Sequence, residues 1–190
     1  MTPAGNNRGR PRGALGLVAI AGLCAGWALQ AGCGIVEEVV DPVHAREIAA
    51  LGSDPSGEEP GPTHRAGQPC LVCHGSAGPN GPELSVAGTI YQTKTGVQAL
   101  RGAVVTLIDA QQTMRQFDTN RTGNFLVRAG TWRPVYPMRV SVSYGGVTVD
   151  MKTHVGREGS CAACHTDPEG PVSAGHVYLT ADPGTFPVGP

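Results

Sequence analysis

Two short segments of this chain carry the same arrangement of sulfur and imidazole groups. Residues 70–74 read Cys-Leu-Val-Cys-His, and residues 161–165 read Cys-Ala-Ala-Cys-His. On a helical turn, residues i, i+3 and i+4 share one face, so each segment would present two thiols and one imidazole together. Such thiols can add to the two vinyl groups of a haem as thioethers, while the imidazole binds the iron. The pattern predicts two covalently attached c-type haems, bound by Cys70, Cys73, His74, Cys161, Cys164 and His165.

Paired cysteines also serve three other chemistries. Each pair could close a local disulfide in an oxidising compartment, or the two pairs could meet in a four-cysteine zinc site. Both of these interpretations leave the histidine after each second cysteine without a role. A thioredoxin-like redox pair needs a βαβ context, which this sequence lacks. Of the six cysteines, Cys24 and Cys33 are the only ones outside the two motifs, so we favour haem.

The residues that precede each motif favour a helical start. Pro69 suits the first position of a helix, because its fixed φ angle is already helical and its missing N–H would have no partner there. Ser160 suits the N-cap position, where its hydroxyl would accept a hydrogen bond from a free backbone N–H. Both motifs are therefore expected on short helical turns.

The sixth coordination position of each iron needs a further ligand, and the remaining histidines can supply it. His64 precedes Cys70 by six residues, and His154 precedes Cys161 by seven. His176 follows the second motif at the start of an expected strand. The candidate distal ligands are therefore His64 for the first haem, and His154 or His176 for the second.

Other side chains are weaker candidates for the sixth position. His44 lies in an expected linker, and we expect it to be exposed to solvent. Met114, Met138 and Met151 are alternatives, but a lone methionine on a strand more often fills a core. Two histidine ligands give saturated, low-potential iron suited to electron transfer, whereas an open position permits ligand or peroxide chemistry. The number of spare histidines favours saturation.

The N-terminal segment has the features of an export signal. Three arginines between residues 8 and 12 precede an apolar stretch at residues 14–31, which ends just before Cys33. This order resembles a bacterial lipoprotein signal, which implies that Cys33 is lipidated, although Gln30 replaces the usual aliphatic residue. The alternative is an uncleaved membrane anchor, since the stretch is close to a spanning length. Either way, we expect export to the periplasmic side of a membrane or to the outer membrane.

The composition of the remaining chain indicates short strands and turns. Glycine (28) and proline (16) are frequent, whereas aromatic residues make up 5% and charged residues 15%, which argues against a helical bundle. A net charge of −1 offers no basic surface for nucleic acid. Residues 34–66 are expected to form a flexible, disordered linker that acts as a tether, with a short helix over residues 43–51.

Alternating and β-branched segments predict about seven short strands. The glycine pair 145–146 between the fifth and sixth segments is a hairpin signal. This pattern predicts a mainly β fold, an antiparallel β-sandwich over residues 84–153 with short haem-binding helical turns at both ends (67–83 and 154–190). The expected strands are residues 85–91, 103–108, 113–117, 124–128, 138–144, 147–149 and 177–179.

Three segments of the expected sandwich carry a resemblance to a known family. Residues 88–91 read Gly-Thr-Ile-Tyr, residues 100–107 read Leu-Arg-Gly-Ala-Val-Val-Thr-Leu, and residues 119–125 read Thr-Asn-Arg-Thr-Gly-Asn-Phe. They resemble the carboxypeptidase regulatory-like, or transthyretin-like, β-sandwich over about residues 86–150. The resemblance implies a fold and not a chemistry. The oxygen donors of residues 118–124 could suggest a calcium loop, but the ligand spacing and terminal glutamate are missing, so we expect a turn.

Together these features resemble a dihaem c-type cytochrome lipoprotein with such a sandwich. Its expected role is electron transfer between redox proteins of the cell envelope, since the chain shows no catalytic triad, phosphate loop or paired carboxylates in a folded segment. A haem peroxidase or small-ligand enzyme with one open haem is the first alternative. A haem-free sandwich stapled by disulfides, which binds a partner, is the second.

Overall fold

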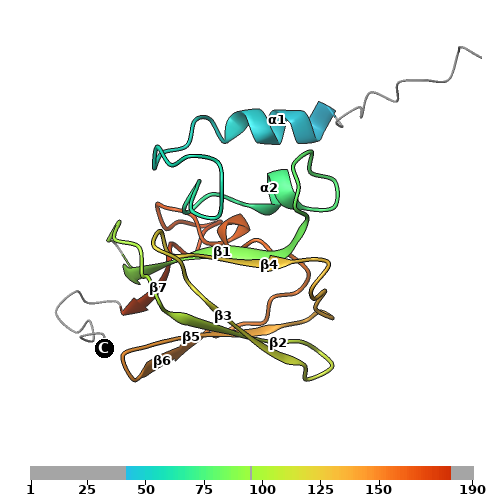
Figure 1. The fold of residues 1–190 in the computed structure, drawn as a ribbon. Helices are drawn as coiled ribbons and strands as arrows, with labels where there is room; N and C mark the ends of the chain where they lie inside the picture. The colour runs from blue at the N-terminus through green and yellow to red at the C-terminus, as the bar shows by residue number, and fades with distance from the viewer. Residues whose placement is uncertain (1–41, 95, 181–190) are drawn as a thin grey trace, which may run out of the picture. The chain divides into compact units, whose positions relative to one another are not determined.

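The computed structural model describes residues 42–94 and 96–180, and Figure 1 shows their fold. The predictions for the signal segment, the lipidation of Cys33 and the membrane anchor lie outside these residues. None of the described helices is long and apolar enough to cross a membrane. The elements are α1 (Pro42–Ala50), α2 (Leu71–His74), β1 (Leu84–Thr93), β2 (Val104–Ile108), β3 (Met114–Asp118), β4 (Asn124–Arg128), β5 (Arg139–Tyr144), β6 (Val147–Asp150), the 3₁₀ turn η1 (Cys161–Ala163) and β7 (Val177–Thr180).

The strands form a mainly β structure of two sheets. One sheet has three strands in the order β4-β1-β7, and the other has four in the order β3-β2-β5-β6. Within the described residues, β1 and β7 are the one parallel pair of strands, whereas the expectation was an antiparallel arrangement throughout. A parallel pair needs a long connection. Here the chain from β1 to β7 runs through the whole four-stranded sheet and then through the second cysteine motif.

The two sheets share one hydrophobic core. Val86, Ile90 and Phe125 contribute to it from the three-stranded sheet, and Val105 and Leu107 from the four-stranded sheet. Residues of β2 alternate between buried and half-buried positions, because successive side chains of a strand point to opposite faces. Fully burying a side chain of this size stabilises the fold by about 1.5–3 kcal/mol, so the shared core holds the two sheets together.

The strands lie where the sequence pattern predicts them. Each predicted boundary falls within two residues of the observed one. The hairpin between β5 and β6 turns at Gly145 and Gly146, whose φ angles are 55° and 81°. Positive φ at both central residues is the type I′ geometry that suits the twist of a two-stranded hairpin. The local signals were therefore sufficient for the strands and this turn.

The segment expected to be a flexible linker is ordered over most of its length. Residues 42–50 form α1, and the following loop is hydrogen-bonded to the turn between β3 and β4 through Asn120, Thr122 and Asn124. Figure 1 shows α1 and α2 on the side of the three-stranded sheet that faces away from the four-stranded sheet. Hydrogen bonds to backbone carbonyls thus order a segment that has little apolar surface to bury.

Candidate functional site

The first cysteine motif is folded as one helical turn. Cys70 occupies the N-cap of α2 with helical dihedral angles, and the backbone N–H of His74 donates to the Cys70 carbonyl at 2.9 Å. The two thiols and the imidazole therefore project from a single turn. Pro69 precedes the cap and is not the first helical residue, but its carbonyl accepts from the Val72 N–H at 3.1 Å and so begins the turn.

The second motif forms a similar but tighter turn. The His165 N–H donates to the Cys161 carbonyl at 2.9 Å, and residues Cys161–Ala163 form a 3₁₀ helix. Ser160 occupies the expected N-cap position, but its buried hydroxyl has no hydrogen-bond partner among the described residues. The predicted capping bond is therefore missing. The Ser160 backbone N–H instead donates to the Glu158 carboxylate at 2.7 Å.

Both motifs lie against the same strand, β1. The Ala87 N–H donates to the Gly159 carbonyl at 2.9 Å, just before the second motif. The Gly67 N–H donates to the Thr89 hydroxyl at 2.8 Å, just before the first motif. A Cβ atom on Gly159 would lie 3.1 Å from the Leu71 side chain. Two motifs far apart in the sequence are therefore neighbours in space.

A cavity of about 650 Å³ opens beside the first motif. Its volume is within the range of small-molecule and cofactor sites, which is about 300–1,000 Å³. The wall is largely apolar, with Leu84, Leu126 and several prolines, and two arginines at 65 and 128 add positive charge. The groups that could hold a cofactor are the two thiols, the motif imidazole and one candidate distal ligand: Cys70, Cys73, His74 and His64.

The rings of His64 and His74 lie close together. Their centroids are 5.8 Å apart, with an interplanar angle of 58°. Two imidazoles on opposite sides of one metal would have centroids about 6 Å apart, since each metal–nitrogen bond is about 2 Å. Nδ1 of His64 contacts the Gly61 carbonyl oxygen. A carbonyl can only accept, so Nδ1 carries the proton and Nε2 is free to bind a metal. The pair is therefore spaced to ligate a single iron.

The imidazole of His74 contains a buried nitrogen that lacks a partner. Its Nδ1 atom is inaccessible to water and has no hydrogen bond within the described part of the chain. A buried polar atom without a partner is costly and rare in a native structure. His74 lines the cavity, and packing, not a hydrogen bond from Nδ1, holds its ring in place.

The second motif has a different set of neighbours. Nδ1 of His165 lies 2.9 Å from the Gly175 carbonyl oxygen. A carbonyl can only accept, so Nδ1 carries the proton and Nε2 is free to bind a metal. The Ala174 N–H donates to the Cys164 carbonyl at 2.9 Å. These bonds bring the segment that leads into β7 onto the second motif.

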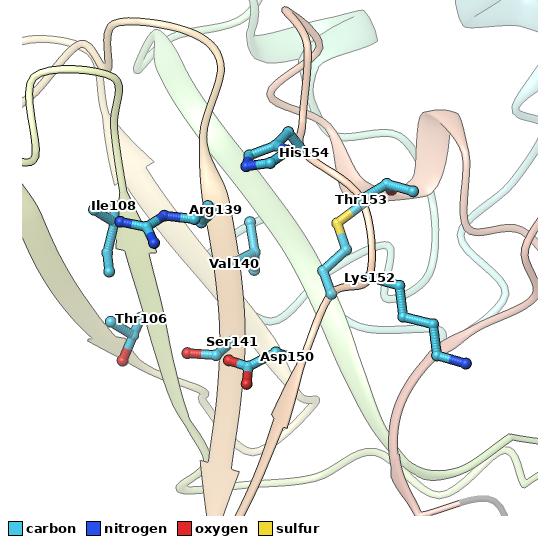
Figure 2. A pocket seen from close by; sticks show the side chains of 10 residues that line it. Thr106, Ile108, Arg139, Val140, Ser141, Asp150, Lys152, Thr153 and His154 are labelled. Atoms are coloured by element: carbon cyan, nitrogen blue, oxygen red, sulfur yellow. The ribbon is translucent and has the colours of Figure 1, made fainter.

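The structure separates the two distal candidates for the second motif. His176 directly follows Gly175, stacks on Tyr91 at a centroid distance of 4.0 Å, and has a buried Nδ1 with no partner among the described residues. His154 is exposed and lines a different cavity of about 290 Å³ on the four-stranded sheet. Figure 2 shows it there with Arg139 and Asp150. Only His176 shares a hydrogen-bonded segment with the second motif.

The other candidate ligands are also placed. Met138 is buried in the shared core, as expected of a core residue, whereas Met114 and Met151 are exposed by 56% and 36%. His44 was expected to be exposed, which is wrong, since its side chain is only 16% exposed. Its Nδ1 lies 3.5 Å from the Glu47 carboxylate one turn later on α1. Ile48, four residues later, is also half-buried, so the two side chains share the less exposed face of α1.

Burial keeps two of the thiols protonated. It raises the pKa of Cys70 to about 11. Burial first, and then the nearby sulfur of Cys70, raises the pKa of Cys161 to about 12. Thiol–disulfide exchange proceeds through the thiolate, so these raised pKa values make the two thiols weak nucleophiles at neutral pH. Within residues 42–94 and 96–180, the four cysteines are free, and no three His, Cys, Asp or Glu side chains are grouped to hold a metal ion.

A haem differs from such a metal site, because the porphyrin itself supplies four ligands and the protein needs to supply at most two. The pair His64 and His74 meets that lower requirement. Comparison of the chain with protein-family models, curated proteins and solved structures found no match. The geometry of the two motifs therefore carries the functional conclusion.

Sequence reasoning did not find the residues that hold the His64 loop. Asn124 and Thr89 are buried, and they hydrogen-bond to this loop and to each other. The sequence feature that could have indicated them is the turn at residues 119–124 with its two asparagines, for which only a turn was predicted. That prediction is correct, because the Asn120 side chain accepts from the backbone N–H groups of Thr122 and Asn124 at 3.0 and 3.1 Å.

Proposed function

We propose that this protein is a membrane-tethered dihaem c-type cytochrome that transfers electrons. The observation that carries the proposal is the cavity in which the rings of His64 and His74 lie 5.8 Å apart, beside both thiols of the first motif. Cys70 and Cys73 would attach the first haem, with His74 and His64 as its axial ligands. Cys161 and Cys164 would attach the second, with His165 as proximal ligand. Each haem would supply a one-electron iron couple.

Electron transfer is favoured over peroxidase chemistry by the ligands available to the first haem. Two imidazoles would leave the iron no open position for a peroxide or a small ligand. For the second haem, the contacts of the segment before β7 favour His176 over His154 as the distal ligand. The arginines at 65 and 128 in the first cavity suit the two carboxylates of a haem.

The packing of both motifs against β1 supports exchange of electrons between the two haems. Cys161 lies against Gly88, and the Gly67 N–H bonds to the neighbouring Thr89. Two attachment segments packed against neighbouring positions of one strand would keep their cofactors at a constant separation. An electron carrier needs nearby redox centres on a rigid scaffold, and it needs no proton-transfer residues.

We further propose that the two sheets form a sandwich of the carboxypeptidase regulatory-like type. The shared core of both sheets and the residue motifs on β1, β2 and β4 support this assignment. The sandwich would be the scaffold, and the chemistry would reside in the attached haems. The N-terminal segment with Cys33 would tether the protein to a membrane on the periplasmic side or in the outer membrane. There it would exchange electrons with other redox proteins of the envelope.

The proposal is tested by the intact mass of the full chain, produced with a cytochrome c maturation system. The expected mass exceeds that of the processed polypeptide by two haems. Cys70→Ala/Cys73→Ala and Cys161→Ala/Cys164→Ala should each carry one haem, which assigns each to its motif. A haem stain on a denaturing gel should be positive, because thioethers survive denaturation. A colourless protein with the mass of its polypeptide and lipid alone would refute the proposal and favour the haem-free binding module.

A further inference from the structure

The loop that carries His64 is fastened to the turn between β3 and β4 by three side chains. Asn120 donates to the Pro62 carbonyl at 2.6 Å, and Thr122 donates to the Thr63 carbonyl at 3.0 Å. Asn124 donates to the His64 carbonyl at 3.0 Å. Three successive peptide groups of a loop rich in proline and glycine are thus bonded to alternate residues of one turn.

Asn124 and Thr89 form the buried centre of this attachment. Their exposed fractions are 3% and 6%. The Thr89 hydroxyl donates to the Asn124 side-chain oxygen at 2.7 Å and accepts from the Gly67 N–H at 2.8 Å. A chain of bonds therefore runs from Gly67 through Thr89 and Asn124 to the carbonyl of His64. It holds the loop on both sides of the imidazole.

The turn itself has little freedom to move. Its Gly123 has a φ angle of +73°, and a Cβ atom there would lie 2.4 Å from the Ile90 carbonyl oxygen. The Asn120 side chain accepts two backbone N–H groups of the same turn. The ion pair between Arg121 and Glu58 adds a second, exposed link to the loop. The hydrogen bonds to the His64 loop therefore start from a turn whose backbone conformation is fixed.

We propose that Asn124 and Thr89 are positioning residues that keep His64 at the sixth coordination position of the first haem. This inference rests on the proposed function. A free loop would lose conformational entropy each time its imidazole bound the iron. A loop fixed in advance avoids that loss, so the iron stays six-coordinate. The two residues touch neither the cofactor nor the iron, and they act through the backbone of the loop.

The test uses the full haem-loaded chain and the rate of carbon monoxide binding to the reduced protein. Thr89→Val removes the hydroxyl at nearly constant shape, whereas Thr89→Ser keeps it and is the matched control. Asn124→Asp removes the donor to the His64 carbonyl and places a carboxylate oxygen against it. Thr89→Val and Asn124→Asp should each increase the rate at one haem on the order of ten-fold, the effect of about one net hydrogen bond. Thr89→Ser should bind at the wild-type rate.

The His64→Ala background separates positioning from a general loss of structure. There the first haem is already open, so adding Thr89→Val should change the rate no further, and added imidazole should close the site again. If Thr89→Val and Asn124→Asp leave the rate unchanged, or raise it equally in the His64→Ala background, the inference is overturned. If both haems are present by mass but His64→Ala opens neither, the inference and the assignment of His64 as an axial ligand fail, while the dihaem cytochrome itself stands. If the wild-type mass contains no haem, the proposed function itself fails.

Discussion

Gly88 lies on β1 directly against the second cysteine motif, and Gly88→Ala tests how closely that motif is packed on the strand. A Cβ atom at this position would lie 2.5 Å from Sγ and 2.6 Å from Cβ of Cys161, and 3.1 Å from the Phe125 ring. Ordinary contacts are about 3.5 Å or longer, so Cys161 would have to retreat by roughly 1 Å. Rotation of the thiol cannot relieve this, because the Cβ atom of Cys161 clashes as well.

The expected cost of this overpacking is about 1–3 kcal/mol of unfolding free energy. For a folded unit of this size, that corresponds to a decrease of roughly 3–10 °C in the melting temperature. Circular dichroism of thermal unfolding measures the loss. The intact mass of the haem-loaded protein should also show a fraction that lacks one haem, because the displaced Cys161 reacts less readily with its vinyl group.

Gly130→Ala is the matched control, since a Cβ atom on Gly130 would meet no heavy atom within 4 Å. This variant should unfold at the wild-type temperature and carry both haems. Equal melting temperatures and equal haem content for Gly88→Ala and Gly130→Ala would refute the contact between β1 and Cys161.

Three further predictions test the scaffold. Phe125→Ala should cost about 3–5 kcal/mol of unfolding free energy, because Phe125 is 1% exposed in the shared core; denaturant unfolding measures it, and a loss below 1 kcal/mol would contradict the shared core. Gly146→Ala should cost about 1 kcal/mol, because its φ angle is +81°, and thermal unfolding should show the loss while haem content stays unchanged. In protein made without haem, the raised pKa values of Cys70 and Cys161, about 11 and 12 against 9.0, mean that the unfolded chain loses its thiol protons first. The contribution of the buried thiols to the unfolding free energy is therefore fully present below pH 9 and is lost as the pH rises through 11. The denaturant midpoint should be lower at pH 10.5 than at pH 8, and this difference should be smaller in Cys70→Ala/Cys161→Ala.

The strands were predictable because their signals are local. Residues 139–144 alternate, the glycine pair at 145–146 provides positive φ, and the pattern holds again over residues 147–150. The parallel pairing of β7 with β1 was not predictable. Alternation reports which face of a strand is buried, but it does not report which strand becomes the neighbour or in which direction it runs.

The loop before the first motif shows a second limit of local reasoning. Its proline, glycine and acidic residues indicate a segment without a core, and this led to the expectation of a flexible linker. The structure orders it with side chains of Asn120, Thr122 and Asn124, which lie more than fifty residues later in the chain. A hydrogen bond between such distant residues leaves no periodic pattern in either segment.

The spacing within each Cys-x-x-Cys-His segment determined its helical turn and the chemistry predicted for it, because all the groups lie within five residues and one turn brings them together. Which histidine stands opposite which motif depended on tertiary structure. The similar spacings of His64 and His154 suggested equivalent roles, yet His64 lies close to His74, whereas His154 lies on the other sheet. The pairing of distant segments with β1 and the buried hydrogen bonds of Asn124 determine where each histidine lies. These contacts join segments that are far apart in the chain, and the distance between two residues along the chain does not show where they meet in the fold.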